Sequence, residues 1–349
     1  MHDGRRDNYK LWATIKSPVA GLRVRDVVPR QQHETVTIES TQSIEDALQL
    51  LGRHGFLSLP VVGDGVIDTL DLALLAVAIF SSVAKLSDEI AVNKFFETTI
   101  GDAVDACLEY RLESNPVFDA RGSVAVDAPL ADLLDMMWGG WHRVQLTAGE
   151  KTVRHVSQSD VLRFMASNLH LVAATREIST AVRLLPRGIL VTARTTDTAL
   201  AALSKLPRHA VSAVPVVDDR GRLVGVFSAS DLRHLDRANI RDLGLPVLDF
   251  IATHAPKNRH FRTLLQRQPT DDDNDDVVEP PQAPPLPYVC KPTDAFDLVL
   301  YKILALKVHR LFVVDDAFSP IGVVSMGDLM RIFLLGNAAE NAQRATIEE

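Results

Sequence analysis

One arrangement of apolar and polar positions occurs four times along this chain. Each copy has an amphipathic helix, a Val-rich strand, a tight turn, a second strand, and a short polar motif that ends in Asp and opens another helix. The clearest copy runs from Ala201 to Leu235, and the last runs from Phe296 to Leu334. Repetition at this scale determines the architecture before the chemistry of any residue is considered. It predicts a mixed α/β (α+β) fold of four similar units, with functional sites between the units.

The four copies are aligned by their first strands, which are followed at similar distances by the Asp motif. The strands read LSLPVVGD from Leu57, HRVQLTAG from His142, SAVPVVDD from Ser212 and HRLFVVDD from His309. The motifs DTLD, SQSD, SASD and SMGD end at Asp71, Asp160, Asp231 and Asp328. Copy one has a shortened turn and copy two lacks the Pro and Val run, so these two match the pattern less well than copies three and four.

The composition is typical of a globular chain without a membrane span or a metal centre. Hydrophobic residues make up 46% of the 349 residues, and the longest apolar stretch covers only residues 72–80. A membrane helix needs about 20 such residues. Cys107 and Cys290 stand alone, outside any Cys/His cluster, so we expect a reducing compartment and no structural metal.

Most of the net charge lies in one segment. The chain carries a net charge of -8, and residues 270–287, TDDDNDDVVEPPQAPPLP, hold six acids and no bases, which leaves about -2 for the rest. Concentrated charge, proline and low hydrophobicity predict a disordered insertion, either simply tolerated or used for docking or phosphorylation. No basic face for nucleic acid is expected. The chain also contains no GxSxG, Walker A, kinase catalytic loop or Cys/His nucleophile motif, so we expect no catalytic activity.

The fourfold order of helix, strand, turn, strand, S-x-x-D and helix resembles tandem cystathionine-β-synthase (CBS) domains arranged as two Bateman modules. Residues 208–232 and 296–335 resemble the third and fourth repeats of the γ regulatory subunits of AMP-activated and sucrose-nonfermenting-related protein kinases. NKFFETTIGDAV at 93–104 resembles the plant-type members. The resemblance implies four CBS repeats paired as two Bateman modules in a pseudo-symmetric disc. It divides the chain into a tail (1–22), repeat 1 (23–92), repeat 2 (93–172), repeat 3 (183–255), a basic stretch with the acidic insertion (256–287), repeat 4 (288–336) and a C-terminal tail (337–349).

The Asp motifs supply the carboxylates that a nucleotide site needs for ribose hydroxyl groups. In S-x-x-D the Ser can cap the new helix and the Asp lies in its first turn, so capping alone explains the motif. Ribose binding can coexist with capping, because a carboxylate has about four acceptor positions. The resemblance implies ribose binding by Asp231 and Asp328, with Asp71 and Asp160 as weaker candidates.

Cations stand at the strand start in only two copies. Copies two and four carry His142-Arg143 and His309-Arg310, whereas copies one and three carry Leu57-Ser58 and Ser212-Ala213. Arginine forks and imidazole N-H groups suit phosphate, so we expect cationic clefts beside copies two and four. The alternative is that these pairs are solvated residues that cap the preceding helix.

The resemblance also implies which positions line adenine-nucleotide sites. It implies one site of Thr195, Thr196, Arg310 and Asp328, and a neighbouring site of Ser212, His309 and Ser325. Lys257 and Arg259 would add phosphate contacts. His142 and Arg143 are weaker candidates, because Leu57 stands where the first repeat would carry Arg and the N-terminal module departs further from the pattern.

The expected function is that of a non-catalytic regulatory subunit that senses AMP, ADP or ATP and regulates a serine/threonine protein kinase complex. Its expected partners are an α-type catalytic subunit and a β-type scaffold subunit, in the cytoplasm, the nucleus or both. One alternative is a constitutive CBS scaffold without ligand switching. Another is a sensor of a different adenosyl ligand that acts on a non-kinase partner. No cofactor, nucleic acid or membrane partner is expected.

Overall fold

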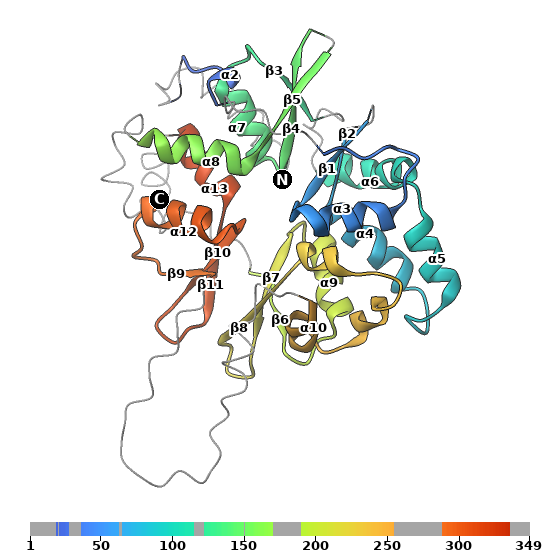
Figure 1. Cartoon of the computed structure of the whole chain (residues 1–349). Coiled ribbons are helices and arrows are strands. Elements are labelled where there is room, and N and C mark those ends of the chain that lie inside the picture. The colour runs from blue at the N-terminus through green and yellow to red at the C-terminus, as the bar shows by residue number, and fades with distance from the viewer. Residues whose placement is uncertain are drawn as a thin grey trace, which may run out of the picture.

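Four strand-and-helix units form the protein in the computed structural model (Figure 1). The described residues are 19, 21–27, 36–62, 65–114, 122–149, 151–169, 190–254 and 288–335. The acidic segment at 270–287, Lys257 and Arg259 lie outside the described residues.

Each copy contains an antiparallel hairpin between two helices. Copy one comprises α3 (Ile44–His54), β1 (Ser58–Val61), β2 (Gly65–Asp68) and α4 (Thr69–Phe80). Copy two comprises β3 (Ser123–Ala125), α7 (Leu130–Trp138), β4 (Arg143–Ala148), β5 (Lys151–Ser157) and α8 (Gln158–Ser167). Copy three comprises β6 (Ala193–Arg194), α9 (Ala199–Arg208), β7 (Ala213–Val217), β8 (Leu223–Ser228) and the 3-10 helix η3 (Ala229–His234). Copy four comprises β9 (Val289–Cys290), α12 (Phe296–Leu306), β10 (Arg310–Val314), β11 (Pro320–Ser325) and α13 (Met326–Leu335).

Three of the hairpins gain a short parallel strand from the segment that precedes the first helix. β3 pairs with β4, β6 with β7, and β9 with β10. In copy one a single parallel bridge between Ile38 and Val61 takes the same place. The mixed α/β fold expected from the repeated pattern is therefore confirmed.

The Asp motif caps the element that follows each hairpin, as the sequence predicts. In copy two the Ser157 hydroxyl accepts from the Asp160 amide at 3.3 Å, while an Asp160 oxygen accepts from the Ser157 amide at 3.0 Å. The same reciprocal bonds occur at Ser325 and Asp328. These bonds pair backbone N-H groups that the start of a helix leaves without partners.

Copy three differs after its motif, because the predicted α-helix is a 3-10 helix, η3. The chain turns immediately beyond it, where the Asp236 side chain accepts from the amides of Ala238 and Asn239 at 2.8 and 3.0 Å. An Asp that bonds nearby amides offers the backbone an alternative to helix continuation. Two short helices then complete the unit, η4 (Ile240–Gly244) and α10 (Val247–His254).

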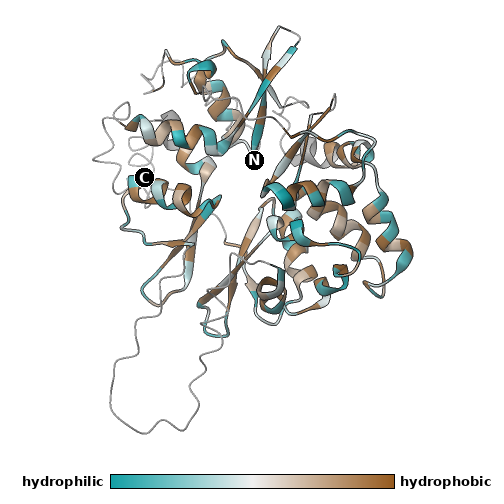
Figure 2. Cartoon of the chain, viewed as in Figure 1, coloured by the Kyte–Doolittle hydropathy of each residue, from teal (hydrophilic) through white to brown (hydrophobic). Residues whose placement is uncertain are grey.

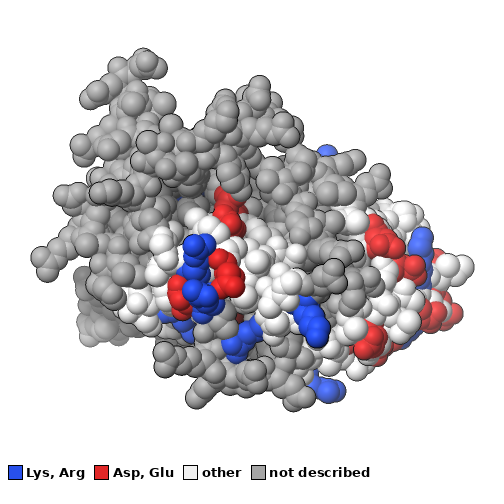
Figure 3. All heavy atoms as spheres, turned by 90° about the horizontal axis from the view of Figure 1, so that it is seen from above, with Lys and Arg blue, Asp and Glu red and all other residues white. Residues whose placement is uncertain are grey.

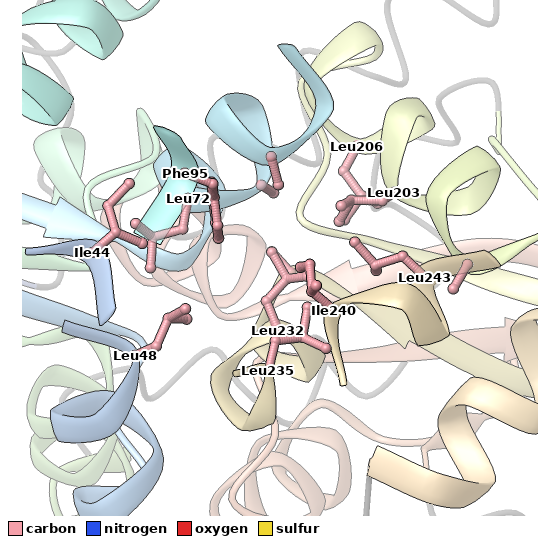
Figure 4. Packing of buried hydrophobic residues seen from close by; sticks show 14 of the residues in the cluster. Ile44, Leu48, Leu72, Phe95, Leu203, Leu206, Leu232, Leu235, Ile240 and Leu243 are labelled. Atoms are coloured by element: carbon pink, nitrogen blue, oxygen red, sulfur yellow. The ribbon is translucent and has the colours of Figure 1, made fainter. Parts of the chain in front are cut away.

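The helices of alternate copies share cores. A first core joins copies one and three, and Figure 4 shows Ile44, Leu48 and Leu72 facing Leu203, Leu232 and Ile240. A second core joins copies two and four and includes Leu134, Met137, Leu300 and Met330. The apolar sides of the helices face these cores and their polar sides face outward (Figure 2).

Segments outside the repeated pattern extend the cores. Between copies one and two, α5 (Glu89–Glu97) and α6 (Ile100–Ser114) follow α4, and α5 adds Phe95 and Phe96 to the first core. Before copy one, α2 (Val24–Val27) adds both of its valines to the second core. Among the described helices, none combines the length and apolar character that a membrane crossing requires.

The hairpins connect consecutive copies. Between copies three and four, the Leu223 amide donates to the Phe318 carbonyl at 2.9 Å, and Leu223 lies in a small cluster with Phe312 and Val314. Between copies one and two, the Gln145 side chain donates to the Gly65 carbonyl at 3.4 Å. Helix contacts between alternate copies and hairpin contacts between consecutive copies bring all four strand starts toward one region.

Candidate functional site

The hairpin register places each His-Arg pair beside its own Asp motif. Arg143 lies opposite Ser157, and Arg310 lies opposite Ser325, the residues that begin the two motifs. Asp160 and Asp328 are close enough for their charges to act on the pKa of the arginine of the same copy. The repeat therefore brings an arginine and a carboxylate together wherever the strand starts with His-Arg.

The two histidines bring copies one, two and four together. The rings of His142 and His309 meet edge to face with centroids 6.1 Å apart. His142 Nδ1 also lies 3.3 Å from Asp68 Oδ2, at the N-terminus of α4. We call the group of His142, Arg143, His309 and Arg310 the central cluster.

His309 is a neutral base in this setting. Burial, and then the charges of His142, Arg310 and Arg233, lower its pKa to about 3. A neutral imidazole has one N-H donor and one acceptor nitrogen. Its buried Nδ1 has no hydrogen-bond partner among the described residues, which is unusual for a buried polar atom. His309 is therefore positioned to bond with a polar group that the described residues do not supply.

Arg310 connects copies three and four. Its Nη2 donates to the Ser212 hydroxyl. Burial lowers the pKa of Arg310 to about 10, although the Asp328 carboxylate opposes the shift, and a guanidinium with such a pKa remains charged at neutral pH. The resemblance to the γ subunits implied that Arg310 and Ser212 belong to neighbouring sites, and the structure places them in direct contact.

The two threonines predicted for the same site as Arg310 lie just after the first strand of copy three. Thr195 and Thr196 follow β6, where Thr195 is half-buried and Thr196 is exposed. Neither makes a hydrogen bond or ion pair with Arg310 or Asp328 within the described part of the chain. The grouping of Thr195, Thr196, Arg310 and Asp328 therefore stays a prediction.

Arg143 reaches from copy two into copy one. Its Cζ lies 5.3 Å from the ring centroid of Phe56, a cation-π distance. Burial lowers the pKa of Arg143, with Asp160 opposing, while burial and Arg143 lower the pKa of nearby His155 to about 4. The Arg143 Nε is buried and unpaired among the described residues, so Arg143 keeps an unused donor, as His309 keeps an unused ring nitrogen.

The candidate ribose carboxylates are half-buried or buried, and each uses an oxygen for capping. Burial raises the pKa of Asp231 to about 6 against the opposing bonds from Ser228 and the charge of Arg233. Asp160 Oδ1 also accepts a hydrogen bond from Arg163 Nη1 at 2.9 Å. Asp71 accepts from the Asp68 amide at 2.8 Å. Asp231 and Asp328 use one oxygen, Oδ2, in their capping bonds, so capping leaves Oδ1 of each for a further donor.

Sequence reasoning missed Arg233, although its charge acts on His309 as those of His142 and Arg310 do. The signal was present in the alignment of copies. The second residue after the Asp is apolar in copies one, two and four, which have Ala73, Leu162 and Met330, and is Arg233 only in copy three.

The half-buried arginines of the central cluster contrast with the surface charges. On the face seen in Figure 3, the basic side chains of the described residues stand singly or beside acidic ones. Arg222 is an example of a partly exposed arginine paired locally, with its guanidinium 2.7 Å from Asp218. No group of three or more His, Cys, Asp or Glu that could hold a metal occurs in the described ranges. The central cluster suits an anion because it brings together the guanidinium groups of Arg143 and Arg310.

Comparison with known proteins defines the class. The family model of the CBS domain matches residues 24–73, 182–237 and 283–335, and the structure shows the corresponding hairpin and helices in copy two as well. Three CBS domains are therefore found within this chain, and the resemblance to CBS domains seen in the sequence is confirmed.

Two relatives indicate which kind of CBS-domain protein this chain is similar to. The γ subunit of 5'-AMP-activated protein kinase from Saccharomyces cerevisiae is 23% identical over 330 residues, which cover 89% of this chain and 90% of that protein. A SNF1-related protein kinase regulatory subunit gamma-like protein of Arabidopsis thaliana is 25% identical over 243 residues, covering 60% of this chain and 62% of that protein. These similarities support the expectation of a regulatory rather than a catalytic chain.

A solved structure supports the fold. A protein of Methanocaldococcus jannaschii, whose description likens it to g-AMPK, superposes with a TM-score of 0.59 at 16% identity. The match covers 89% of this chain and 100% of that chain. The same arrangement of units thus recurs at low sequence identity.

Proposed function

We propose that this chain is the regulatory subunit of a serine/threonine protein kinase complex and binds an adenine nucleotide, AMP, ADP or ATP, at the central cluster. One observation carries the proposal: two His-Arg pairs from different copies meet, and His309 Nδ1 and Arg143 Nε are buried without partners among the described residues. The relatives are named as γ subunits of protein kinases, which supports a kinase complex as the partner. The proposed partners within it are an α-type catalytic subunit and a β-type scaffold subunit. The proposed compartment is the cytoplasm, the nucleus or both.

The cluster provides the groups that such a ligand requires. The guanidinium groups of Arg143 and Arg310 would receive phosphate oxygens. The second oxygen of Asp328 or Asp231 would accept from ribose hydroxyls. His309, neutral at pH 7, would donate or accept one hydrogen bond.

Regulation would follow from the contacts that join copies. A ligand shifts a conformational equilibrium only by its difference in affinity for the two states. The Arg310 contact with Ser212 and the His142 contact with Asp68 each join two copies. A phosphate that binds Arg310 in place of Ser212, or His142 in place of Asp68, would break a contact between two copies. The resulting change in how the copies pack would be transmitted to the kinase complex.

Calorimetry with AMP, ADP and ATP tests the proposal. We expect wild type to bind at least one nucleotide and Arg310→Met to lose at least about tenfold in affinity, the amount expected for one charge-assisted hydrogen bond. Arg222→Met is the matched control, because Arg222 is half-exposed and paired with Asp218. The absence of nucleotide binding by wild type, or equal binding by Arg310→Met, would refute this assignment.

A constitutive scaffold is the second candidate. It is favoured by the internal partners that Ser212 and Asp68 already give to Arg310 and His142. In that case the kinase subunits would associate with wild type and Arg310→Met equally, with or without nucleotide. Native mass spectrometry of protein purified without added ligand would separate the two candidates, because a retained nucleotide would add its mass.

A further inference from the structure

Copy one lacks the His-Arg pair that copies two and four contribute to the central cluster. Its strand start is Leu57-Ser58, where Leu57 is half-buried and Ser58 is 3% exposed. The hairpin register is nevertheless the same, with Ser58 opposite Asp68 as Arg143 is opposite Ser157. The backbone of copy one therefore presents a strand start of the same kind without a cation.

Arg233 of copy three occupies the neighbourhood of this strand start. Its Nη1 donates to the carbonyl of Phe56 at 3.2 Å, and its Nε donates to the carbonyl of Ser230 at 2.8 Å. Arg143 lies over the ring of the same Phe56. Guanidinium groups from copies two and three thus converge on the residue immediately before Leu57.

The position of Arg233 in its own copy is exceptional. The equivalent Ala73, Leu162 and Met330 are all 0% exposed and belong to the cores. An apolar residue therefore satisfies the fold at this position. Arg233 is half-buried, and a charge withdrawn from water is costly unless it is paired. Burial does lower the pKa of Arg233, with Asp231 opposing. Two carbonyl groups accept hydrogen bonds from Nε and Nη1 of Arg233, and no described group accepts one from its Nη2.

The backbone that carries Arg233 is held closely against copy one. A Cβ on Gly52 of α3 would come within 2.7 Å of the Arg233 carbonyl oxygen. Such a distance is shorter than real Cβ contacts, so the glycine permits the approach of η3 to α3. Beyond η3, Arg237 bonds Glu45 of α3 at 2.9 Å and Asn93 of α5 at 2.6 Å. The chain at and just beyond Arg233 is thus held against copy one.

We infer that Arg233 binds an anion beside the central cluster and supplies, from copy three, the cation that the strand start of copy one lacks. The ligand class is a phosphate group, which Arg233 would bind together with Arg143 and His309. The identity of that phosphate as part of an adenine nucleotide rests on the proposed function, whereas the role of Arg233 toward an anion does not.

Binding of three probes to four proteins tests the inference. The probes are AMP, adenosine and inorganic pyrophosphate, measured by calorimetry, with thermal unfolding as a check on folding. The proteins are wild type, Arg233→Met, the surface control Arg222→Met, and the double variant Leu57→Arg/Arg233→Leu. Methionine keeps much of the length and apolar contact of the arginine side chain and removes its donors.

We expect Arg233→Met to weaken AMP and pyrophosphate at least about tenfold while leaving adenosine unchanged, because only the charge-assisted bonds to phosphate are lost. Arg222→Met should bind all probes like wild type. The double variant, which moves the arginine to copy one, should regain most of the affinity for AMP and pyrophosphate. Unchanged affinity of Arg233→Met for both anions would overturn the inference, as would equal weakening of adenosine.

The two proposals fail separately in this experiment. If wild type binds pyrophosphate but neither AMP nor adenosine, the nucleotide assignment is wrong, and the effect of Arg233→Met on pyrophosphate still decides the role of Arg233. If wild type binds none of the probes, both proposals are wrong. If Arg233→Met unfolds at a much lower temperature than wild type, the double variant decides instead, because its Arg233→Leu change introduces an apolar residue like those of the other copies.

Discussion

Copies two and four begin their first strand with His-Arg, whereas copies one and three begin it with Leu-Ser and Ser-Ala. The hairpins nevertheless pair in the same register, with Arg143 opposite Ser157 and Ala213 opposite Ser228. The comparison shows that the cores and the helix caps determine the fold, whereas the residues at the strand start can differ between copies and can serve binding. The cations then act where the copies meet.

The largest expected effects come from the two cores that underlie this comparison. Leu203 lies in the core of copies one and three and Leu134 in that of copies two and four, both at most 1% exposed. We expect Leu203→Ala and Leu134→Ala each to lower the free energy of unfolding by about 2–5 kcal/mol, through lost burial and a cavity. Urea unfolding measures the loss.

Hydrogen exchange would show how far each loss spreads. We expect Leu203→Ala to reduce protection mainly in copies one and three, and Leu134→Ala mainly in copies two and four, because each residue packs in its own core. Equal loss of protection across all four copies from either variant would show that the two cores unfold as one unit.

Two glycine-to-alanine variants compare how closely copies one and three approach each other with how closely copies two and four do. The Cβ of Gly52→Ala would lie 2.7 Å from a backbone oxygen, whereas the nearest atom to the Cβ of Gly327→Ala would be the Trp138 Cα at 3.5 Å. We expect Gly52→Ala to cost about 1–3 kcal/mol in unfolding free energy. Gly327→Ala should change it little or raise it by up to about 1 kcal/mol. Equal effects in urea unfolding would contradict the close approach of η3 to α3.

Replacing His309 with Leu makes the strand start of copy four resemble that of copy one and removes a pH-dependent term. The pKa of His309 is about 3 in the folded chain and near 6.5 unfolded. The unfolded chain therefore binds the extra proton between these values, so His309 contributes stability above pH 6.5 that is lost as the pH falls toward 3.

We expect the pH slope of the unfolding free energy to fall by about 1.4 kcal/mol per pH unit in His309→Leu between pH 4 and 6. Asp231 acts in the opposite direction, because burial raises its pKa to about 6, so the difference between variant and wild type is the informative quantity. Identical slopes from urea titrations at several pH values would show that His309 is not buried as a neutral base.

The smallest effects are expected at ion pairs. Arg237 of copy three pairs with Glu45 and Glu97 and lies 5.4 Å from the Phe96 ring centroid. We expect Arg237→Met to cost about 1 kcal/mol. Arg25→Met should cost less than about 0.5 kcal/mol, because Arg25 is 64% exposed and pairs only with Asp127 among the described residues. If Arg25→Met proves the more damaging in thermal unfolding, Arg237 does not hold copies one and three together.

The repeated pattern predicted much of the fold because strand alternation and S-x-x-D caps are local signals. It did not predict α5 and α6, which lie outside the template, or that the Asp motif of copy three opens a 3-10 helix. In the second case the outcome depends on Asp236, whose side chain competes for backbone amides just beyond the motif.

The candidate site could be predicted only in part. The His-Arg pairs were visible as a difference between copies, and their positions opposite the Asp motifs follow from the hairpin register. The contacts of Arg143 and Arg233 with Phe56 join residues far apart in the chain, and no local pattern encodes which copies will share a core. Arg233 could have been noticed as the one polar residue at an otherwise apolar position.

The alternation of cores along the chain has a consequence for synthesis. The helices of copy one pack against residues of copy three, the last of which is Ile251. Those of copy two pack against residues of copy four, the last of which is Met330. The first core can therefore close only after residue 251 has been synthesised, and the second only after residue 330. Contacts of such high sequence separation are associated with slow folding, so the apolar helix faces of copies one and two stay exposed until these later residues have been made.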